Sequence, residues 1–356
     1  MTIAVIGVGL IGGSIGLAAR ERLGATVHGF DAGDGVLDRA LERGAVDRTC
    51  ATVAEAVDGA DTAFVAVPVG ALPAAVAETL AAAGPECVVS DVGSTKRDVV
   101  AAHDDSRFVG GHPVAGAETA GVEHARADLF DAATWYLTPT ATTSGILYER
   151  LHRVIADLGA VPAAIDAATH DRLLANVSHL PHVLANVLVS QAARTLAGEN
   201  ERLPVTGPSF RDATRVAGAN GAIWTDIYLS NRDALVEQLD ETRRRLAAVR
   251  EALAAGDRDR ITEWNERAAG DRRALLEAAL TGGPVHELRV SVPNEPGVVA
   301  QIALELGRAG INITDMALYP AADMREGVVA LWIAGDEPAA RAEERAAALG
   351  FPVARA

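Results

Sequence analysis

The sequence is poor in cysteine, with only Cys50 and Cys87 among its 356 residues. Two cysteines provide neither a disulfide framework nor a metal cluster, and they suit a reducing compartment. Long apolar runs are also missing, because no stretch of about 18 apolar residues is free of charges or of Gly and Pro interruptions. No basic segment precedes the apolar residues Met1 to Ile6. We therefore expect no signal peptide, no membrane span and a cytoplasmic location.

Basic residues are outnumbered, with 32 Lys and Arg against 48 Asp and Glu, and the formal net charge is −16. Such a surface repels nucleic acid phosphates and anionic membranes, so we expect neither as a partner. If the substrate is itself an anion, the site must gather local positive charge.

Residues 1–165 alternate short β-rich runs with alanine-rich helical stretches. Continuous apolar strands separated by helices indicate a parallel sheet covered on both faces, so we predict a doubly wound, Rossmann-type α/β domain. The expected strands are Ile3 to Ile6, Thr26 to Phe30, Ala63 to Val67, Cys87 to Ser90, Phe108 to Gly110 and Trp135 to Leu137.

The β signal vanishes over residues 166–280, where segments such as Asp171 to Leu196 and Ile223 to Leu253 have apolar residues at helical spacing. We predict an all-helical domain that carries substrate-binding residues and forms a homodimer interface. A breaker cluster at Thr281 to Pro284 then predicts a linker. Residues 285–356 return to a βαββαβ order, which is typical of a small α+β domain.

A glycine-rich turn, Gly7-Val8-Gly9-Leu10-Ile11-Gly12, follows the first strand and opens a helix. Gly7 permits the tight turn, Gly9 lets the backbone approach a pyrophosphate, and Gly12 allows close packing of helix on strand. The helix start at Leu10 and Ile11 offers N–H groups and a positive dipole end to phosphates. The alternative is that these glycines only shape a turn.

Asp31 directly follows the second strand, about 20 residues past the glycines, where an acidic side chain accepts hydrogen bonds from the adenosine ribose. It would repel a 2′-phosphate, and Arg39 and Arg43 lie too far along the next helix to reverse that preference. We therefore predict NAD as the cofactor.

Two further polar segments follow strands of the predicted sheet. Ser90 to Lys96 comes after one strand, and Gly111 to Glu118 comes after the next. The carboxyl ends of such strands are where ligands bind, and His112 there can accept a proton from a substrate hydroxyl while hydride leaves the carbon. The alternative for His112 alone is a histidine satisfied within a loop.

The helical region places His179 and His182 on one helix face, with Pro181 between them expected to kink the helix or open its hydrogen-bond ladder. Metal binding is an alternative, but no Cys or carboxylate with ligand spacing accompanies the pair, so we predict no metal. Farther along, Arg211 and Arg215 supply guanidinium groups suited to carboxylate binding, although each alone also fits a solvated helix face.

Taken together, the segments GVGLIGGS, SDVGSTK, GGHPVAGAETAG, VSHLPH and FRDATR…W, in this order, resemble the prephenate dehydrogenases of tyrosine biosynthesis. The resemblance covers the chain through about Leu280. It implies an NAD-dependent oxidoreductase that oxidatively decarboxylates prephenate to 4-hydroxyphenylpyruvate.

The resemblance also implies roles for individual residues. His112 matches the catalytic histidine that binds the C4 hydroxyl, and Ser94 matches a serine that helps hold that hydroxyl and the histidine. Arg215 matches the arginine that grips the ring carboxylate of the substrate. The remaining pocket positions that match are His179, His182, Glu118, Asp212 and Trp224.

The C-terminal segment VPNEPGVVAQIALELGRAGINITDM resembles an ACT domain, a regulatory module that some family members carry. Pro296 can start a helix, Gly297 leaves room for a ligand beside Asn294, and Asn312 can hydrogen-bond an amino acid. We expect an aromatic amino acid, tyrosine in particular, to bind between paired ACT domains and inhibit. The alternative is a packing domain that only extends the dimer.

Three rival functions stay open. Arogenate dehydrogenase shares the chemistry, and its substrate differs only in a side-chain amino group. A β-hydroxyacid or imine oxidoreductase has a similar plan but lacks the GGHPVAG and SHLPH pairing. A non-catalytic sensor of NADH and an amino acid would not need His112, Ser94 and Arg215 together.

Overall fold

A computed structural model describes residues 1–116, 119–197, 206–278, 284–293, 298, 301–302, 305–306, 309, 311, 313–321 and 325–355. They form two compact units, Met1–Arg244 and Arg245–Ala356, and helix α11 (Arg232–Ala255) runs through the division. The domain limits near residues 165 and 280 remain predictions.

The first unit is built on a sheet with strand order β3-β2-β1-β4-β5-β6-β7-β8 within the described residues. The six strands β1 to β6 are mutually parallel. Strand β7 runs antiparallel to β6, and β8 is parallel to β7. This order is that of a doubly wound dinucleotide-binding sheet, which confirms the predicted fold class. The strands are β1 (Thr2–Ile6), β2 (Thr26–Phe30), β3 (Arg48–Thr49), β4 (Thr62–Val65), β5 (Val88–Asp91), β6 (Phe108–Pro113), β7 (Thr134–Thr138) and β8 (Val161–Ala164).

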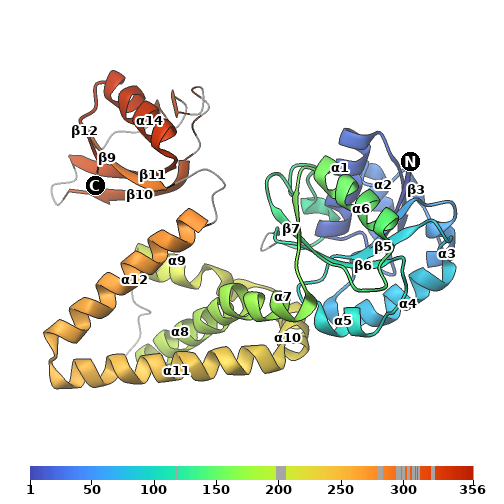
Figure 1. Ribbon diagram of the computed structural model, residues 1–356, viewed down its shortest axis with the longest axis horizontal. Helices are drawn as coiled ribbons and strands as arrows, with labels where there is room; N and C mark the ends of the chain where they lie inside the picture. Colours follow the sequence, from blue (N-terminus) through green and yellow to red (C-terminus); the bar gives the residue numbers. More distant parts are fainter. Residues whose placement is uncertain are drawn as a thin grey trace. The chain divides into compact units, whose positions relative to one another are not determined.

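Helices bury both faces of the sheet. Neighbouring residues on a strand point to opposite faces, so one strand can contribute side chains to two apolar clusters. In β1, Ile3 and Val5 pack in one apolar cluster with α1 and α6, whereas Ala4 and Ile6 pack in a second cluster with α3, α4 and α5. Figure 1 shows these two groups of helices on either side of the sheet. The helices are α1 (Leu10–Leu23), α2 (Val36–Glu42), α3 (Val53–Val57), α4 (Leu72–Ala82), α5 (Arg97–Ala101) and α6 (Gly145–Asp157).

The rest of the first unit is helical, as predicted. Its helices are α7 (Ala167–Leu174), α8 (Leu180–Ala197), α9 (Pro208–Thr214), α10 (Gly221–Ser230) and the first half of α11. A π-helical turn, Ala175–His179, ends two residues before Pro181. Proline lacks the N–H that a regular turn needs, and the widened turn accommodates this defect, which confirms that Pro181 opens the ladder.

The segment Ile223 to Leu253 is helical, as predicted, but the structure divides it at Asn231 into α10 and α11. Asn231 is fully buried, and its side-chain amide donates to the carbonyl oxygen of Asp171 at 2.7 Å. This buried contact with α7 fixes Asn231 outside helical geometry, where tertiary packing overrides local helical spacing.

By length and composition alone, the helical run Ala167–Arg194 is apolar enough to cross a membrane, with a mean hydropathy of 1.3 over its best window. The core helix of a soluble protein passes the same test. This run carries Asp171 and Arg172 near its start and supplies buried polar side chains to the site described below.

The second unit contains an antiparallel sheet of order β10-β11-β9-β12. Helix α14 packs on it through Ala339, Ala342 and Ala346, against strand residues such as Leu288 and Leu331. In the same unit the Arg272 guanidinium lies 5.4 Å from the Trp332 ring centroid, a cation–π contact. Besides the second half of α11, the described elements of the second unit are α12 (Arg258–Ala278), β9 (Val285–Pro293), β10 (Ile313–Pro320), β11 (Glu326–Ala334), α14 (Asp336–Ala348) and β12 (Val353–Arg355).

Candidate active site

The glycine-rich turn lies where the strand order reverses, between β1 and β4, the usual ligand position in such sheets. Gly7 has φ +93°, and a Cβ there would lie 2.5 Å from the Ala66 carbonyl oxygen. A Cβ on Gly12 would lie 1.9 Å from the Gly7 carbonyl oxygen, so both positions require glycine. A Cβ on Gly9 would instead meet no atom within 4 Å.

That open space belongs to a crevice of about 640 Å³ lined by Gly7, Gly9, Leu10, Ile11 and Asp31, among others. Since Gly9 has no side chain to cap α1, the first N–H groups of this 14-residue helix are available to a phosphate. The residues present therefore fit a dinucleotide.

Asp31 is held rigidly at the rim of this crevice. Its Oδ2 accepts from the Val8 N–H and its Oδ1 from the Gly33 N–H, both at 2.7 Å, and each oxygen keeps a lone pair for a ribose hydroxyl. The two nearby arginines are engaged elsewhere: Arg39 pairs with Glu123 and Arg43 donates to the Ala125 carbonyl. This arrangement favours a ribose without a 2′-phosphate.

A second cavity, of about 580 Å³, brings together five of the predicted site residues: Ser94, His112, His179, Arg215 and Trp224. They come from the loop after β5, from β6, from the π-helical turn, from the turn Arg215–Gly218 and from α10. The crevice and this cavity share Ser94, Ala115, Gly116, Trp224 and Ile227 in their linings. A ligand in one therefore reaches a ligand in the other.

His112 lies inside β6, opposite Tyr136 of β7, rather than in the loop after the strand as the sequence suggested. It is 8% exposed, and its Nδ1 lies 2.9 Å from Nε2 of His170. Burial, together with the neighbouring His170, Lys96 and His179, lowers the pKa of His112 well below 6.5. His112 is therefore a neutral base at physiological pH.

A buried charge network that the sequence analysis missed lies beneath this residue. Lys96 and Asp91 are both 0% exposed and form an ion pair. Asp91 also accepts from the Gly93 and Gly111 N–H groups. Burial lowers the pKa of Lys96, against the opposing effect of Asp91. The segment SDVGSTK contains both residues, but nothing in its spacing indicates that they pair.

His179 and His182 face different surroundings. Burial lowers the pKa of His179 to about 4, and its Nδ1 lies 3.1 Å from the Asn231 amide nitrogen. His182 does not line the second cavity; its ring stacks on Trp224 with centroids 3.6 Å apart and hydrogen-bonds to Tyr228. His182 thus packs against Trp224, which lines the second cavity, without lining that cavity itself.

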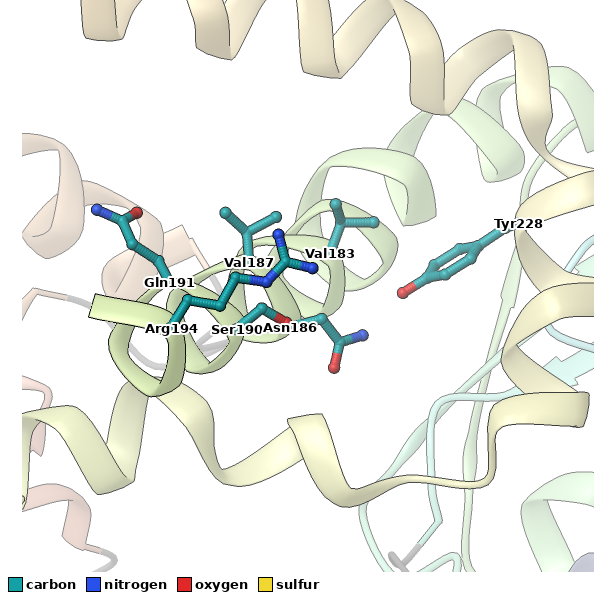
Figure 2. Close-up of a pocket in the computed structure, with 7 residues that line it drawn as sticks. All are labelled: Val183, Asn186, Val187, Ser190, Gln191, Arg194 and Tyr228. Carbon is teal, nitrogen blue, oxygen red and sulfur yellow. The ribbon is translucent and has the colours of Figure 1, made fainter. Parts of the chain in front are cut away.

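A third cavity, of about 550 Å³, lies along α8, which supplies most of its lining (Figure 2). Figure 2 shows the Tyr228 hydroxyl directed towards a single face of α8. The lining residues are Val183, Asn186, Val187, Ser190, Gln191, Arg194 and Tyr228. Asn186 links this cavity to His182, with 3.2 Å between its amide nitrogen and Nδ1 of the ring.

Among the described residues, one further predicted position is not brought into the site. Asp212 is exposed on α9 and lines none of these cavities. Glu118 lies outside the described residues, and so do the predicted effector-binding residues Asn294, Pro296, Gly297 and Asn312.

Two family models match the chain. The prephenate dehydrogenase nucleotide-binding domain matches residues 15–163, and the prephenate dehydrogenase dimerization domain matches residues 166–266. A prephenate dehydrogenase of Bacillus subtilis (strain 168) is 32% identical over 354 residues, which span 96% of this chain and 95% of that protein.

Solved structures of prephenate and arogenate dehydrogenases are also similar to this chain. A prephenate dehydrogenase of Aquifex aeolicus, in complex with hydroxyphenyl propionate and NAD⁺, is 26% identical with a TM-score of 0.73. The match covers 77% of this chain and 98% of that chain. An arogenate dehydrogenase of Synechocystis is 28% identical with a TM-score of 0.67, over 76% of this chain and 99% of that one.

Proposed function

The chain belongs to the prephenate dehydrogenase family, and from this premise we propose how its residues carry out the NAD-dependent oxidative decarboxylation of prephenate. The observation that carries the proposal is the shared wall of the two cavities. His112 lines the second cavity beside Ser94 and Trp224, which also line the dinucleotide crevice. Hydride transfer needs such adjacency between cofactor and substrate.

The glycine turn and Asp31 bind the cofactor, which when bound supplies the acceptor for the hydride leaving C4 of the substrate. Neutral His112 takes the proton of the C4 hydroxyl, and Ser94 hydrogen-bonds the same oxygen. As the C4 ketone develops, the ring carboxylate leaves as carbon dioxide, and aromatisation drives the step forward.

Arg215 orients the substrate by pairing with the ring carboxylate, and Trp224 forms an apolar wall backed by His182. The guanidinium supplies the local positive charge that an anionic substrate needs on a chain of net charge −16. The predicted pocket roles of Glu118 and His179 belong to the same proposal.

The test is His112→Asn, which keeps a polar side chain but removes the base. We expect kcat with prephenate to fall about 10²–10⁴-fold, the usual contribution of a general base. NAD affinity should stay unchanged, and the exposed control His152→Asn should be fully active. Normal turnover by His112→Asn would refute the role of His112 as the base. If the wild-type protein binds NAD and responds to an amino acid but shows no turnover, the sensor alternative is favoured.

Arogenate is the second candidate substrate, favoured by the similarity to the Synechocystis enzyme. Prephenate stays the first candidate because the Bacillus subtilis relative, which matches 96% of this chain, is a prephenate dehydrogenase. Comparing kcat/KM for the two substrates decides the matter.

We also propose that the protein is a cytoplasmic homodimer. The match to a dimerization domain and the exposed apolar side chains of α8 support the dimer. Cys50 and Cys87 are buried free thiols, as expected in a reducing compartment.

We propose that the C-terminal sheet and helix form an ACT domain, and that tyrosine bound there lowers the enzyme's activity. The strand order and the helix on one face of the second unit support this assignment. Tyrosine should inhibit the full-length protein and not a form ending near Gly283. A truncated core is a reasonable control, because solved relatives match over about three quarters of this chain. Equal inhibition of both forms would overturn the proposal.

A further inference from the structure

His170 bridges His112 and Asp171 through two hydrogen bonds. Its Nε2 lies 2.9 Å from Nδ1 of His112, and its Nδ1 lies 2.8 Å from Oδ1 of Asp171. His170 is 0% exposed and Asp171 is 1% exposed. Neither residue has a predicted role from the sequence, although both lie on α7 and His170 contacts the histidine of β6 directly.

Asp171 is fixed as an ionised acceptor. Its carboxylate accepts from the backbone N–H groups of Lys96 at 2.8 Å and Arg97 at 3.0 Å, and it pairs with the Arg97 side chain at 3.5 Å. Burial opposes ionisation, but the hydrogen bonds from His170, Arg97 and Lys96 outweigh it and lower the pKa of Asp171. Because an ionised carboxylate only accepts, Nδ1 of His170 must be the donor.

The proton on Nδ1 determines the remaining positions. Neutral imidazole has one N–H, so Nε2 of His170 carries a lone pair and accepts. Nδ1 of His112 must then be the donor of the 2.9 Å bond. One of the two facing nitrogens must be without a proton for this bond to form, and a neutral His170 supplies it at Nε2. Neutral His112 is therefore left with its lone pair on Nε2.

We propose that His170, oriented by Asp171, is a positioning residue that keeps His112 in the Nδ1–H tautomer, with Nε2 bare to accept the substrate proton. The inference rests on the proposed role of His112 as that acceptor. In the step, the O–H bond at C4 breaks and an Nε2–H bond forms. The resulting imidazolium keeps its Nδ1–H bond to His170, and no proton moves on to Asp171.

The ionisable groups around His112 come from several elements. Lys96 lies before α5, His170 and Asp171 lie on α7, and His179 lies on the π-helical turn. Tyr136 packs edge-on against His170, with centroids 5.6 Å apart. Asp91 pairs with Lys96, whereas Asp171 reaches His112 through His170, so the tautomer depends on that one side chain.

Two substitutions at His170 separate positioning from structure. His170→Leu removes the acceptor, so we expect kcat with prephenate to fall about 10²–10³-fold, with KM unchanged, because a base in the wrong tautomer is ineffective. His170→Gln keeps an acceptor oxygen and should retain kcat within about tenfold of the wild type. His152→Leu is the exposed control, and thermal melting checks that each variant is folded. Equal losses in the Leu and Gln variants would mean a merely structural role.

The tautomer is also measurable in the wild-type protein without any assay of turnover. Nitrogen-15 NMR of the histidine rings should show the His112 Nδ1 protonated and the Nε2 unprotonated, with His112→Asn assigning the signals. A protonated Nε2 overturns the positioning proposal even if His112 is essential. Full turnover by His112→Asn instead overturns the proposed function, so the two failures are distinguishable.

Discussion

At the scale of single residues, burial sets the protonation of His112. Because its pKa is lowered well below 6.5, the group binds a proton only at a pH under that value, and the active neutral form persists above it. We expect kcat/KM for prephenate to be constant near neutrality and to fall as the pH drops through the lowered pKa. A plot of log kcat/KM against pH checks this. An acidic limb centred at 6.5 or above would contradict the burial argument.

Lys96 is the second residue with a decisive environment. Replacing it with Met would leave the Asp91 charge buried and unpaired, so we expect the free energy of unfolding to fall by about 3–5 kcal/mol. The exposed pair Arg267–Glu263 is the matched control, and Arg267→Met should change stability by less than about 1 kcal/mol. Denaturant unfolding of both variants provides the comparison. Similar losses in the two would refute the role given to burial.

At the scale of elements, substitution by alanine should have different effects at two glycines of the same turn, one on stability and the other on NAD binding. Gly12→Ala places a Cβ against the Gly7 carbonyl, so we expect a loss of about 1–3 kcal/mol and a lower melting temperature. Gly9→Ala meets no protein atom, so its melting temperature should not change, while its Cβ enters the crevice and weakens NAD binding. Calorimetry and NAD titration test both. Equal stability of the two variants would contradict this packing.

Sequence patterns predicted the elements well where one physical signal dominates. Apolar runs identified β1, β2 and β4, and the glycine spacing located the start of α1. Two-residue β3 and half-exposed β8 carry too little apolar pattern to be recognised. The break at Asn231 depends on a partner 60 residues away, which no local pattern reports.

The same limit applies to the site. Ser94, His112, Arg215 and Trp224 were found because each stands in a recognisable segment, and the structure brings them into one cavity. His170 and Asp171 were missed because their role arises only when α7 packs against β6 and the start of α5. A histidine followed by an aspartate has no distinctive spacing, so the sequence offers no signal for the bridge.

At the scale of the whole molecule, the exposed apolar surface of α8 predicts assembly. Leu188 is 43% exposed between the exposed residues Val187 and Val189. We expect Leu188→Glu to weaken the dimer, because a charge would be buried in an apolar interface. Leu41→Glu on α2 is the control, since Leu41 is 49% exposed outside the dimerization-domain match. Light scattering after size exclusion measures both masses. A dimeric Leu188→Glu variant would place the interface elsewhere.

The most direct test of the central claim is NADH formation by the purified protein, with prephenate and arogenate offered in parallel and each combined with NAD and with NADP. We expect rapid turnover of prephenate with NAD, and little activity with NADP because the Asp31 carboxylate would repel a 2′-phosphate on the ribose. Absence of turnover with either substrate, while NAD still binds, would contradict the account and remove the catalytic role of His112.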